Sequence, residues 1–135
     1  PKSKRLAIDT VEGRHIGNCM YYDIDMRQGE AELGIMIGDR DYWDKGYGTD
    51  ALGVLLGHVF TTLPLTRMYL HTLEWNRRAQ RAFAKAGFHE VKKVRRHGLD
   101  FILMEIWRSE WERRQTAKLQ RAAENTREET AESPH

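Results

Sequence analysis

The first third of the chain consists of short apolar segments separated by polar turns. Residues 5–10 and 15–24 are mostly apolar or aromatic, with a turn at 11–14 between them, which predicts a β-hairpin over residues 5–24. A second turn at 27–30 leads into residues 31–38, which are apolar on both faces from Leu33 onward. Such a run is typical of a strand at the centre of a sheet.

The apolar spacing changes from a strand pattern to a helical one at residue 49. Apolar residues then recur three and four positions apart as far as residue 60, which predicts a helix. Thr49 or Asp50 can cap its first turn, because their side-chain oxygens accept hydrogen bonds from free backbone N–H groups. Pro64 follows the last apolar position and ends the segment.

A strand, a second helix and a final hairpin follow. Residues 67–75 alternate as in a strand, and Asn76 is placed to cap the next helix. That helix is expected to end at Gly87, a natural C-cap. Its buried stripe is expected to consist of Ala79, Ala82, Phe83 and Ala86. Residues 88–94 and 99–107 predict a hairpin around His97 and Gly98.

The predicted order of elements is β, β, β, α, β, α, β, β. Residues 31–75 form a β–α–β unit, for which we expect a right-handed parallel crossover. The other strands can pair antiparallel. The sequence therefore predicts an α/β fold with a single mixed, mostly antiparallel β-sheet flanked by helices.

Composition fits one globular domain with a charged tail. The chain has 135 residues, 40% hydrophobic and 31% charged. Residues 108–135 carry six Lys/Arg and six Glu. We therefore expect a core domain over residues 1–111 and a tail over residues 112–135 that changes from helical to disordered.

Charge and cysteine content indicate the cellular compartment and the classes of partner. The formal net charge of +2 does not by itself indicate nucleic acid, and the basic run at residues 92–96 has no interleaved aromatic residues for base stacking. No apolar stretch reaches the ~20 residues that a bilayer requires. The one cysteine, Cys19, cannot form an internal disulfide, which is compatible with the cytoplasm. We expect a cytoplasmic protein that binds neither nucleic acid nor membrane.

The segment from Trp43 to Thr49 (Trp-Asp-Lys-Gly-Tyr-Gly-Thr) joins a buried strand to the start of a helix. Glycines let the backbone approach an anion, and the helix start offers unpaired N–H groups and the positive end of the helix dipole. Lys45 adds a positive charge. The spacing fits neither a nucleotide P-loop nor a dinucleotide-binding motif, and an ordinary strand-to-helix turn remains the alternative interpretation.

A second segment favours the anion site over the ordinary turn. It consists of residues 74–88 (Glu-Trp-Asn-Arg-Arg-Ala-Gln-Arg-Ala-Phe-Ala-Lys-Ala-Gly-Phe). Together the two segments resemble the GNAT superfamily of N-acetyltransferases: the first its pyrophosphate loop, the second its Asn…Ala…Tyr-Glu-Lys-x-Gly-Phe segment. The branch with ribosomal-protein and spermidine acetyltransferases is the most similar. The likeness covers about residues 5–107. The family's first strand and two helices are not seen before Leu6, which leads us to expect an N-terminally truncated core.

The resemblance implies a binding site for acetyl-CoA as co-substrate, without a metal. In the family, the central strand separates from its parallel neighbour and the pantetheine arm lies in the gap. The backbones of Ile35 and Ile37 are then expected to bind that arm. The pyrophosphate is expected on the loop and helix start, formed by Trp43, Asp44, Lys45, Gly46, Tyr47, Gly48 and Thr49. Asn76, Ala79 and Phe83 are expected beside the arm.

Three positions depart from the family pattern. Phe83 stands where the family commonly has Tyr, which is taken to protonate the leaving thiolate, so a dedicated general acid is in doubt. Water can serve instead, because a thiol with a pKa of about 8.5 is a good leaving group. Trp43 replaces the usual Gln or Arg. Asp44 would repel a pyrophosphate unless it points to solvent or pairs with Lys45 or Arg40.

Three side chains are candidates for the general base that removes a proton from the amine. His71 ranks first, because its ordinary pKa of about 6.5 suits the task near neutral pH. Its alternative role is a structural histidine bonded to the backbone. Glu32 ranks second, with a cross-sheet charge pair as its alternative. Glu74 ranks third, since it can simply support the cap region at Asn76.

The resemblance implies an enzyme that transfers an acetyl group from acetyl-CoA to a primary amine. The acceptor can be a protein N-terminus, a polyamine or another small amine. The alternatives are an antibiotic-modifying acetyltransferase and a non-catalytic acyl-CoA-binding module. An exposed sheet edge favours a homodimer.

Overall fold

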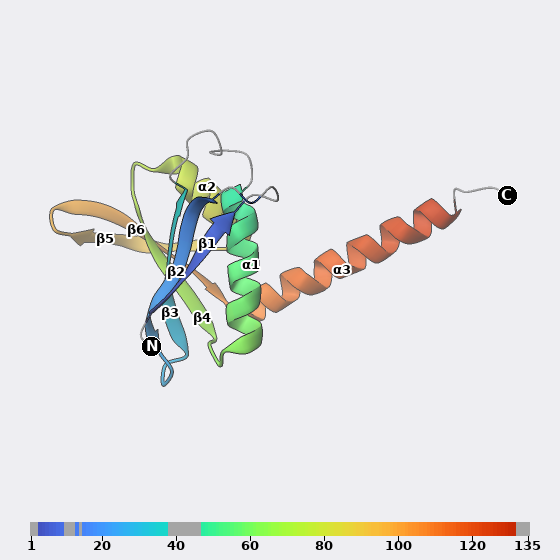
Figure 1. Cartoon of the computed structure of the whole chain (residues 1–135), viewed down its shortest axis with the longest axis horizontal. Coiled ribbons are helices and arrows are strands. Elements are labelled where there is room, and N and C mark those ends of the chain that lie inside the picture. The colour runs from blue at the N-terminus through green and yellow to red at the C-terminus, as the bar shows by residue number, and fades with distance from the viewer. Residues whose placement is uncertain (1–2, 10–12, 14, 38–46, 132–135) are drawn as a thin grey trace.

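The computed structural model describes residues 3–9, 13, 15–37 and 47–131. Strands and helices follow one another in the predicted order, with a third helix at the C-terminal end (Figure 1). Their bounds are β1 Ser3–Asp9, β2 His15–Asp25, β3 Glu30–Ile37, α1 Tyr47–Thr62, β4 Arg67–Leu73, α2 Arg77–Ala86, β5 His89–Arg96, β6 Leu99–Trp107 and α3 Arg108–Ala131.

The strands form one six-stranded sheet in the order β1-β2-β3-β4-β6-β5. Strands β3 and β4 pair in parallel, and each of the other neighbouring pairs is antiparallel. This confirms the prediction of a mixed, mostly antiparallel sheet with a parallel β3–α1–β4 crossover. Strand β3 also lies between two neighbours, as its apolar character predicted.

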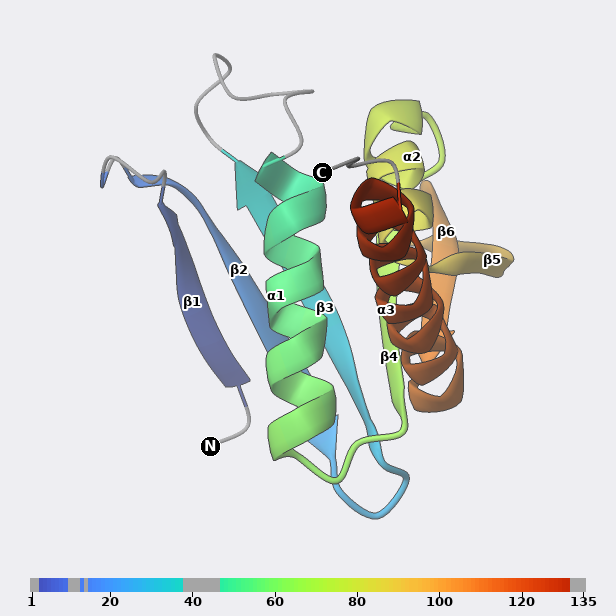
Figure 2. The same ribbon diagram turned by 90° about the vertical axis from the view of Figure 1, so that its right-hand side faces the viewer.

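The hydrophobic core lies between one face of the sheet and the helices α1 and α2 (Figure 2). Alternate strand residues face this core, because successive side chains of a strand point to opposite faces. The strand contribution includes Cys19, Tyr21, Ala31, Leu33, Met68, Leu70, Ile102, Met104 and Ile106. Helix α1 contributes Leu52, Leu55, Leu56, Val59 and Phe60. Each fully buried leucine stabilises the fold by about 1.5–3 kcal/mol.

Helix α2 has both of the predicted caps. The side chain of Asn76 accepts a hydrogen bond from the Ala79 backbone N–H at 3.2 Å. Gly87 adopts φ = 114°, and its N–H bonds back to the last turn of the helix. The buried stripe is narrower than expected: Phe83 is buried, whereas the three alanines of the predicted stripe are half-buried.

Helix α3 is anchored at its base and then projects away from the domain (Figure 1). The ring of Trp111 packs on Phe60 of α1, with 5.6 Å between the centroids. The Arg108 guanidinium donates to the carbonyls of Phe60, Leu63 and Leu65, where α1 ends. In the described part of the chain, no helix is both long and apolar enough to cross a membrane.

Candidate active site

The two parallel strands at the centre of the sheet separate halfway along their length. Register partners between β3 and β4 run from Glu30 and Arg67 to Glu32 and Tyr69. Strand β3 nevertheless continues to Ile37 and β4 to Leu73, each still paired with its outer neighbour. Beyond Glu32 and Tyr69, β3 and β4 are therefore no longer paired with each other.

Helix α1 begins at the end of the sheet where these strands separate (Figure 2). It starts at Tyr47, two residues before the predicted start, so that Tyr47, Gly48 and Thr49 form its first turn. The first N–H groups of a helix lack partners within the helix. The remaining predicted loop residues, Trp43, Asp44, Lys45 and Gly46, lie outside the described residues.

His71 and Glu32 meet on the sheet face that is turned away from the core. The distance from His71 Nδ1 to Glu32 Oε2 is 2.8 Å, across neighbouring strands and 39 residues apart in sequence. The two side chains are only 11% and 10% exposed. The first- and second-ranked base candidates therefore form one pair. Glu32 has the cross-sheet partner that its alternative role anticipated, whereas His71 bonds a carboxylate rather than the backbone.

Two tyrosines flank Glu32 on either side. Tyr22 is its register partner on β2, and Tyr69 is its register partner on β4. Burial raises the pKa of Tyr22 to about 12, reinforced by the charge of Glu32 and a hydrogen bond to it. Burial and then the charge of Glu32 raise the pKa of Tyr69 as well. Both phenols therefore stay protonated at neutral pH, and that of Tyr22 donates to the Glu32 carboxylate.

An arginine beside Tyr69 pairs with two further carboxylates. Arg67 contacts Glu105 at 2.7 Å and Glu30 at 2.9 Å, and its guanidinium lies 4.7 Å from the centroid of the Tyr69 ring. Burial alone would lower the pKa of Arg67, but the hydrogen bonds to Glu105 and Glu30 outweigh it and raise the pKa. Burial alone would raise the pKa of Glu105, but Arg67 and Trp107 hold it below its ordinary value.

The other candidate residues lie around this centre. Ile35 is half-buried in the part of β3 that has separated from β4, and Ile37 is the last residue of that strand. Asn76 opens α2, Ala79 is half-buried and Phe83 is buried against Phe88. These positions agree with the predicted surroundings of a bound arm, and the binding roles remain predictions.

Glu74, the third base candidate, lies in the turn after β4 and has a different partner. Its carboxylate contacts Lys93 of β5 at 2.7 Å, which raises the pKa of that lysine. Its backbone carbonyl accepts a hydrogen bond from Gln80 of α2. The structure thus brings together His71 and Glu32 and ties Glu74 to the β5–β6 hairpin.

Tyr22, Tyr69 and Arg67 were not among the residues predicted for the site. Strand alternation placed Tyr69 on the face of His71, which was a usable signal. The contribution of Tyr22 depends on the β2–β3 register, for which the local sequence has no marker. The pairing of Arg67 with Glu105 likewise depends on the late strand β6 lying beside β4.

The sequence is similar to those of known acetyltransferases. Residues 2–89 match the model of the acetyltransferase (GNAT) domain. An uncharacterized N-acetyltransferase, p20, from Bacillus licheniformis is 40% identical over 53 residues, which are 39% of this chain and 29% of that protein. The matched segment is thus less than a third of the curated relative.

Solved structures of one enzyme from Vibrio cholerae have the same fold. Mutant forms of its spermidine/spermine N-acetyltransferase SpeG align with a TM-score of 0.76 at 24% identity, over 84% of this chain and 72% of that one. The complex of this enzyme with CoA and spermine aligns with a TM-score of 0.73 at 23% identity, over 82% of this chain and 68% of that one.

The domain match covers more than half of the chain, and the fold and the separated central strands agree with it. The chain belongs to the GNAT acetyltransferase family.

Proposed function

We propose that this protein transfers the acetyl group of acetyl-CoA to a primary amine, with His71 as the general base and Glu32 as the residue that orients it. The observation that carries this proposal is the position of the pair. His71 and Glu32 lie where β3 and β4 separate, which is where a bound thioester would meet an amine.

The separated strands fit the pantetheine arm of CoA. The arm contains amides, and buried backbone N–H and C=O groups need hydrogen-bond partners. The free edge of β3, at Ile35 and Ile37, can therefore bind the arm as an additional strand. Asn76, which caps α2, then lies beside the arm together with Ala79 and Phe83 of that helix. A SpeG structure solved with CoA supports the same ligand for this fold.

The start of α1 fits the pyrophosphate of CoA. Tyr47, Gly48 and Thr49 form its first turn, whose N–H groups lack partners within the helix and lie at the positive end of the helix dipole. The preceding residues from Trp43 to Gly46 complete the predicted loop. The loop and helix start thus bind the pyrophosphate of CoA, and the free edge of β3 binds its pantetheine arm.

The pair is arranged to supply a base. An ionised carboxylate can only accept hydrogen bonds, so His71 Nδ1 carries the hydrogen and donates it to Glu32. The lone pair on Nε2 is then available to take a proton from the attacking amine. Low exposure keeps both groups away from bulk water. Bound acetyl-CoA supplies the thioester carbonyl, and backbone N–H groups near Ile35 can stabilise the charge on its oxygen.

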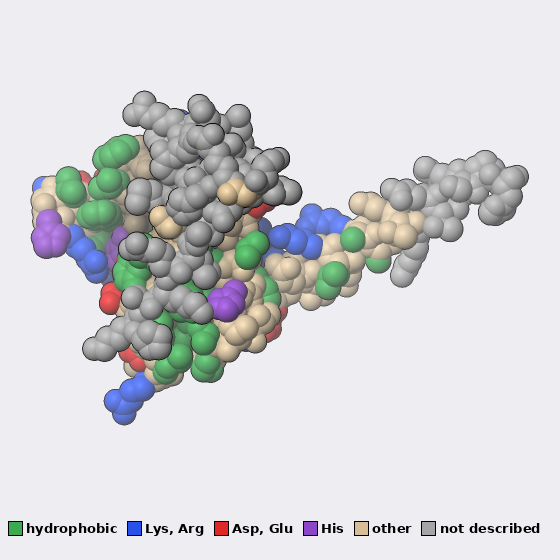
Figure 3. All heavy atoms as spheres, in the orientation of Figure 1, with side chains coloured by type: hydrophobic (Ala, Val, Ile, Leu, Met, Phe, Trp, Pro, Cys, Tyr) green, Lys and Arg blue, Asp and Glu red, His purple; other side chains and the backbone are tan. Residues whose placement is uncertain are grey.

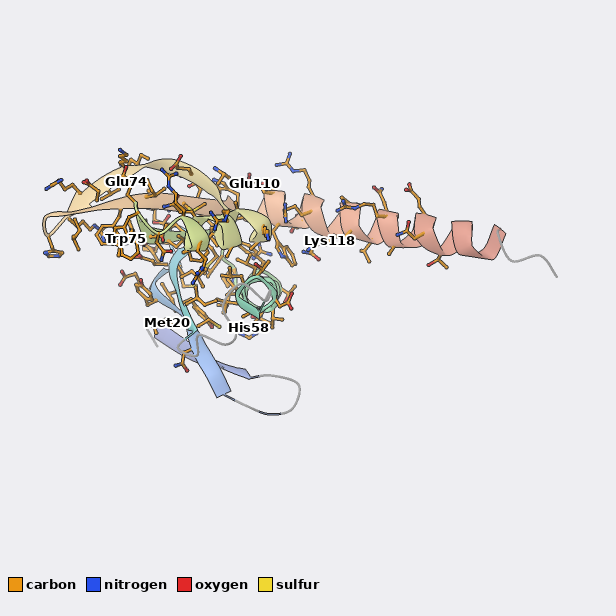
Figure 4. All side chains as sticks on the ribbon, turned by 90° about the horizontal axis from the view of Figure 1, so that it is seen from above. Met20, His58, Glu74, Trp75, Glu110 and Lys118 are labelled. Carbon is orange, nitrogen blue, oxygen red and sulfur yellow. The ribbon has the colours of Figure 1, made fainter. Side chains whose placement is uncertain are left out.

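The test measures release of free thiol from acetyl-CoA over a panel of primary amines. His71→Gln should lower kcat by about 100-fold and remove the ionisation of His71 from the pH profile. Glu32→Gln should lower kcat less, about tenfold, because the amide can donate as well as accept and no longer fixes the tautomer of His71. His58→Gln is the matched control: this histidine lies on α1 (Figure 4), which covers the opposite face of the sheet, and its replacement should leave kcat unchanged.

Two results would contradict the proposal. One is a His71→Gln variant with the wild-type kcat and pH profile. The other is a folded protein that shows no binding of CoA by calorimetry. Thermal stabilisation by CoA without turnover on any amine would instead favour the non-catalytic acyl-CoA-binding module.

A further inference from the structure

The exposed side of α2 is positively charged. Four of the five exposed residues of this helix are Arg77, Arg78, Arg81 and Lys85, here called the basic face, and the fifth is Ala84. The helix contains neither Asp nor Glu. In the described part of the chain, no carboxylate pairs with Arg77, Arg81 or Lys85. These three charges are thus not compensated by the acidic groups whose positions are described.

This distribution of charge opposes the stability of the helix. Arg77, Arg81 and Lys85 are four residues apart, so that like charges are neighbours on the helix surface. Arg77 and Arg78 also occupy the first turn, at the positive end of the helix dipole, where carboxylates are the stabilising residues. A bound anion would relieve both effects. The basic face is therefore better explained as a binding surface for an anion than as a feature that supports the fold.

The basic face lies at the end of the molecule where the phosphates of CoA are expected. Figures 1 and 2 both show α2 and the first turn of α1 at the same end of the sheet, and the two helices pack against each other. The proposed pyrophosphate site is in that first turn, and the proposed arm lies beside Asn76 and Ala79. The remaining part of CoA is its adenosine with a 3′-phosphate. Because the adenosine is joined directly to the pyrophosphate, it must lie at this end too.

Cations outnumber carboxylates on the two helices that meet here. Helix α1 carries one carboxylate, Asp50, against the four cations of α2. The positive surface also extends beyond α2, because Arg114 of α3 donates to the Lys85 carbonyl at 2.8 Å. Figure 3 shows Lys and Arg side chains along the part of α3 that adjoins the domain. A surface with an excess of one charge attracts a ligand of the opposite charge.

We propose that the basic face of α2, chiefly Arg77, Arg78 and Arg81, binds the 3′-phosphate of CoA. This inference rests on the proposed function, and it assigns a third part of the same ligand. A phosphate monoester carries nearly two negative charges at neutral pH and has three acceptor oxygens. The planar guanidinium of arginine matches such a group with paired N–H donors. The protein therefore distinguishes CoA from 3′-dephospho-CoA, which has the same thiol, arm and pyrophosphate but a free 3′-hydroxyl.

The first experiment measures binding of the two compounds to the full chain by calorimetry. We expect the dissociation constant of CoA to be about tenfold lower than that of 3′-dephospho-CoA, because only CoA makes the charge-assisted hydrogen bonds to the arginines. The ratio of the two constants should shrink as the salt concentration is raised, since the site is exposed and its charges are screened.

The second experiment removes the arginines. The triple variant Arg77→Gln, Arg78→Gln and Arg81→Gln should bind CoA about tenfold more weakly and 3′-dephospho-CoA as before. Folding is not at risk, because the positions are exposed and Gln has nearly the helix propensity of Arg. Lys92→Gln is the control, since this exposed lysine lies on the sheet face of His71, opposite α2, and should change neither constant.

The outcomes separate this inference from the proposed function. Equal dissociation constants of the wild type for the two compounds would overturn the 3′-phosphate site and leave the acetyltransferase in place. A triple variant that still prefers CoA by tenfold would do the same, because the phosphate would then be held by other residues. If the folded protein binds neither compound, the proposed function fails and the 3′-phosphate site fails with it.

Discussion

Arg108 at the start of α3 binds the end of α1 and the loop that follows it, and removal of its guanidinium should be costly. Its guanidinium donates to the carbonyls of Phe60 and Leu63, at the end of α1, and of Leu65 in the following loop. Its own backbone N–H donates to the Thr66 carbonyl at 2.7 Å. Arg108→Met keeps the apolar stem of the side chain and this backbone bond, and removes only the guanidinium donors.

The size of the effect follows from the burial of the acceptors. A hydrogen bond to a charged group contributes about 1.5–3 kcal/mol net, and an abandoned buried acceptor adds its desolvation penalty. Phe60 and Leu65 are 1% and 0% exposed, whereas Leu63 is half-buried, so its carbonyl can regain water. Two such losses, at the Phe60 and Leu65 carbonyls, predict a fall of about 3–6 kcal/mol in the free energy of unfolding. That is a large part of the ~5–15 kcal/mol typical of a domain.

Urea denaturation followed by tryptophan fluorescence measures this loss directly. Arg113→Met is the matched control, because Arg113 is exposed on the same helix and its guanidinium makes only a long hydrogen bond, of 3.4 Å, to the Ser109 carbonyl. It should change the free energy of unfolding by no more than about 0.5 kcal/mol. A loss below about 1 kcal/mol for Arg108→Met would refute the reasoning that these carbonyls depend on the guanidinium.

Two further predictions concern a glycine and an acid titration. Gly87→Ala should lower the free energy of unfolding, measured in urea, by about 1–3 kcal/mol, because φ is 114° and a Cβ would lie 2.9 Å from Arg114 Nε. The control Gly53→Ala, in open space on α1, should raise it by about 0.5–1 kcal/mol. Equal effects of the two substitutions would contradict the argument. The pKa of Glu105 is depressed, so its contribution to stability is complete above the unfolded value of about 4.3 and is lost as pH falls through the folded value. The urea midpoint of the wild type should therefore fall more steeply between neutral pH and about pH 3.5 than that of Glu105→Gln. If the two midpoints fall equally with pH, protonation of Glu105 does not affect stability through its pair with Arg67.

Local patterns in the sequence were sufficient for most of the elements. The apolar run at residues 31–38, the alternation over residues 67–75 and the helical spacing after Thr49 located β3, β4 and α1 to within a few residues. The turn at His97 and Gly98 was also predicted correctly, and both residues have positive φ. These features could be read in advance because they depend on neighbouring residues, whose steric and hydrogen-bonding preferences act over one turn or one strand.

The site was predicted in part. His71 and Glu32 were separate candidates for one role, and their pairing was not foreseen. Their contact depends on the parallel register that places Glu32 beside Tyr69, and register is a property of two strands and not of either alone. The early separation of the strands was expected only from the family resemblance.

The sequence by itself determined the order of strands and helices, the caps at Asn76 and Gly87, and the residue types available for acid–base chemistry. Tertiary structure alone decided which of those residues meet. His71 reaches Glu32 across 39 residues, and Arg108 reaches the end of α1 across as many as 48. Such contacts follow from sheet order and helix packing, in which the burial of a whole apolar face outweighs the preferences of any single residue.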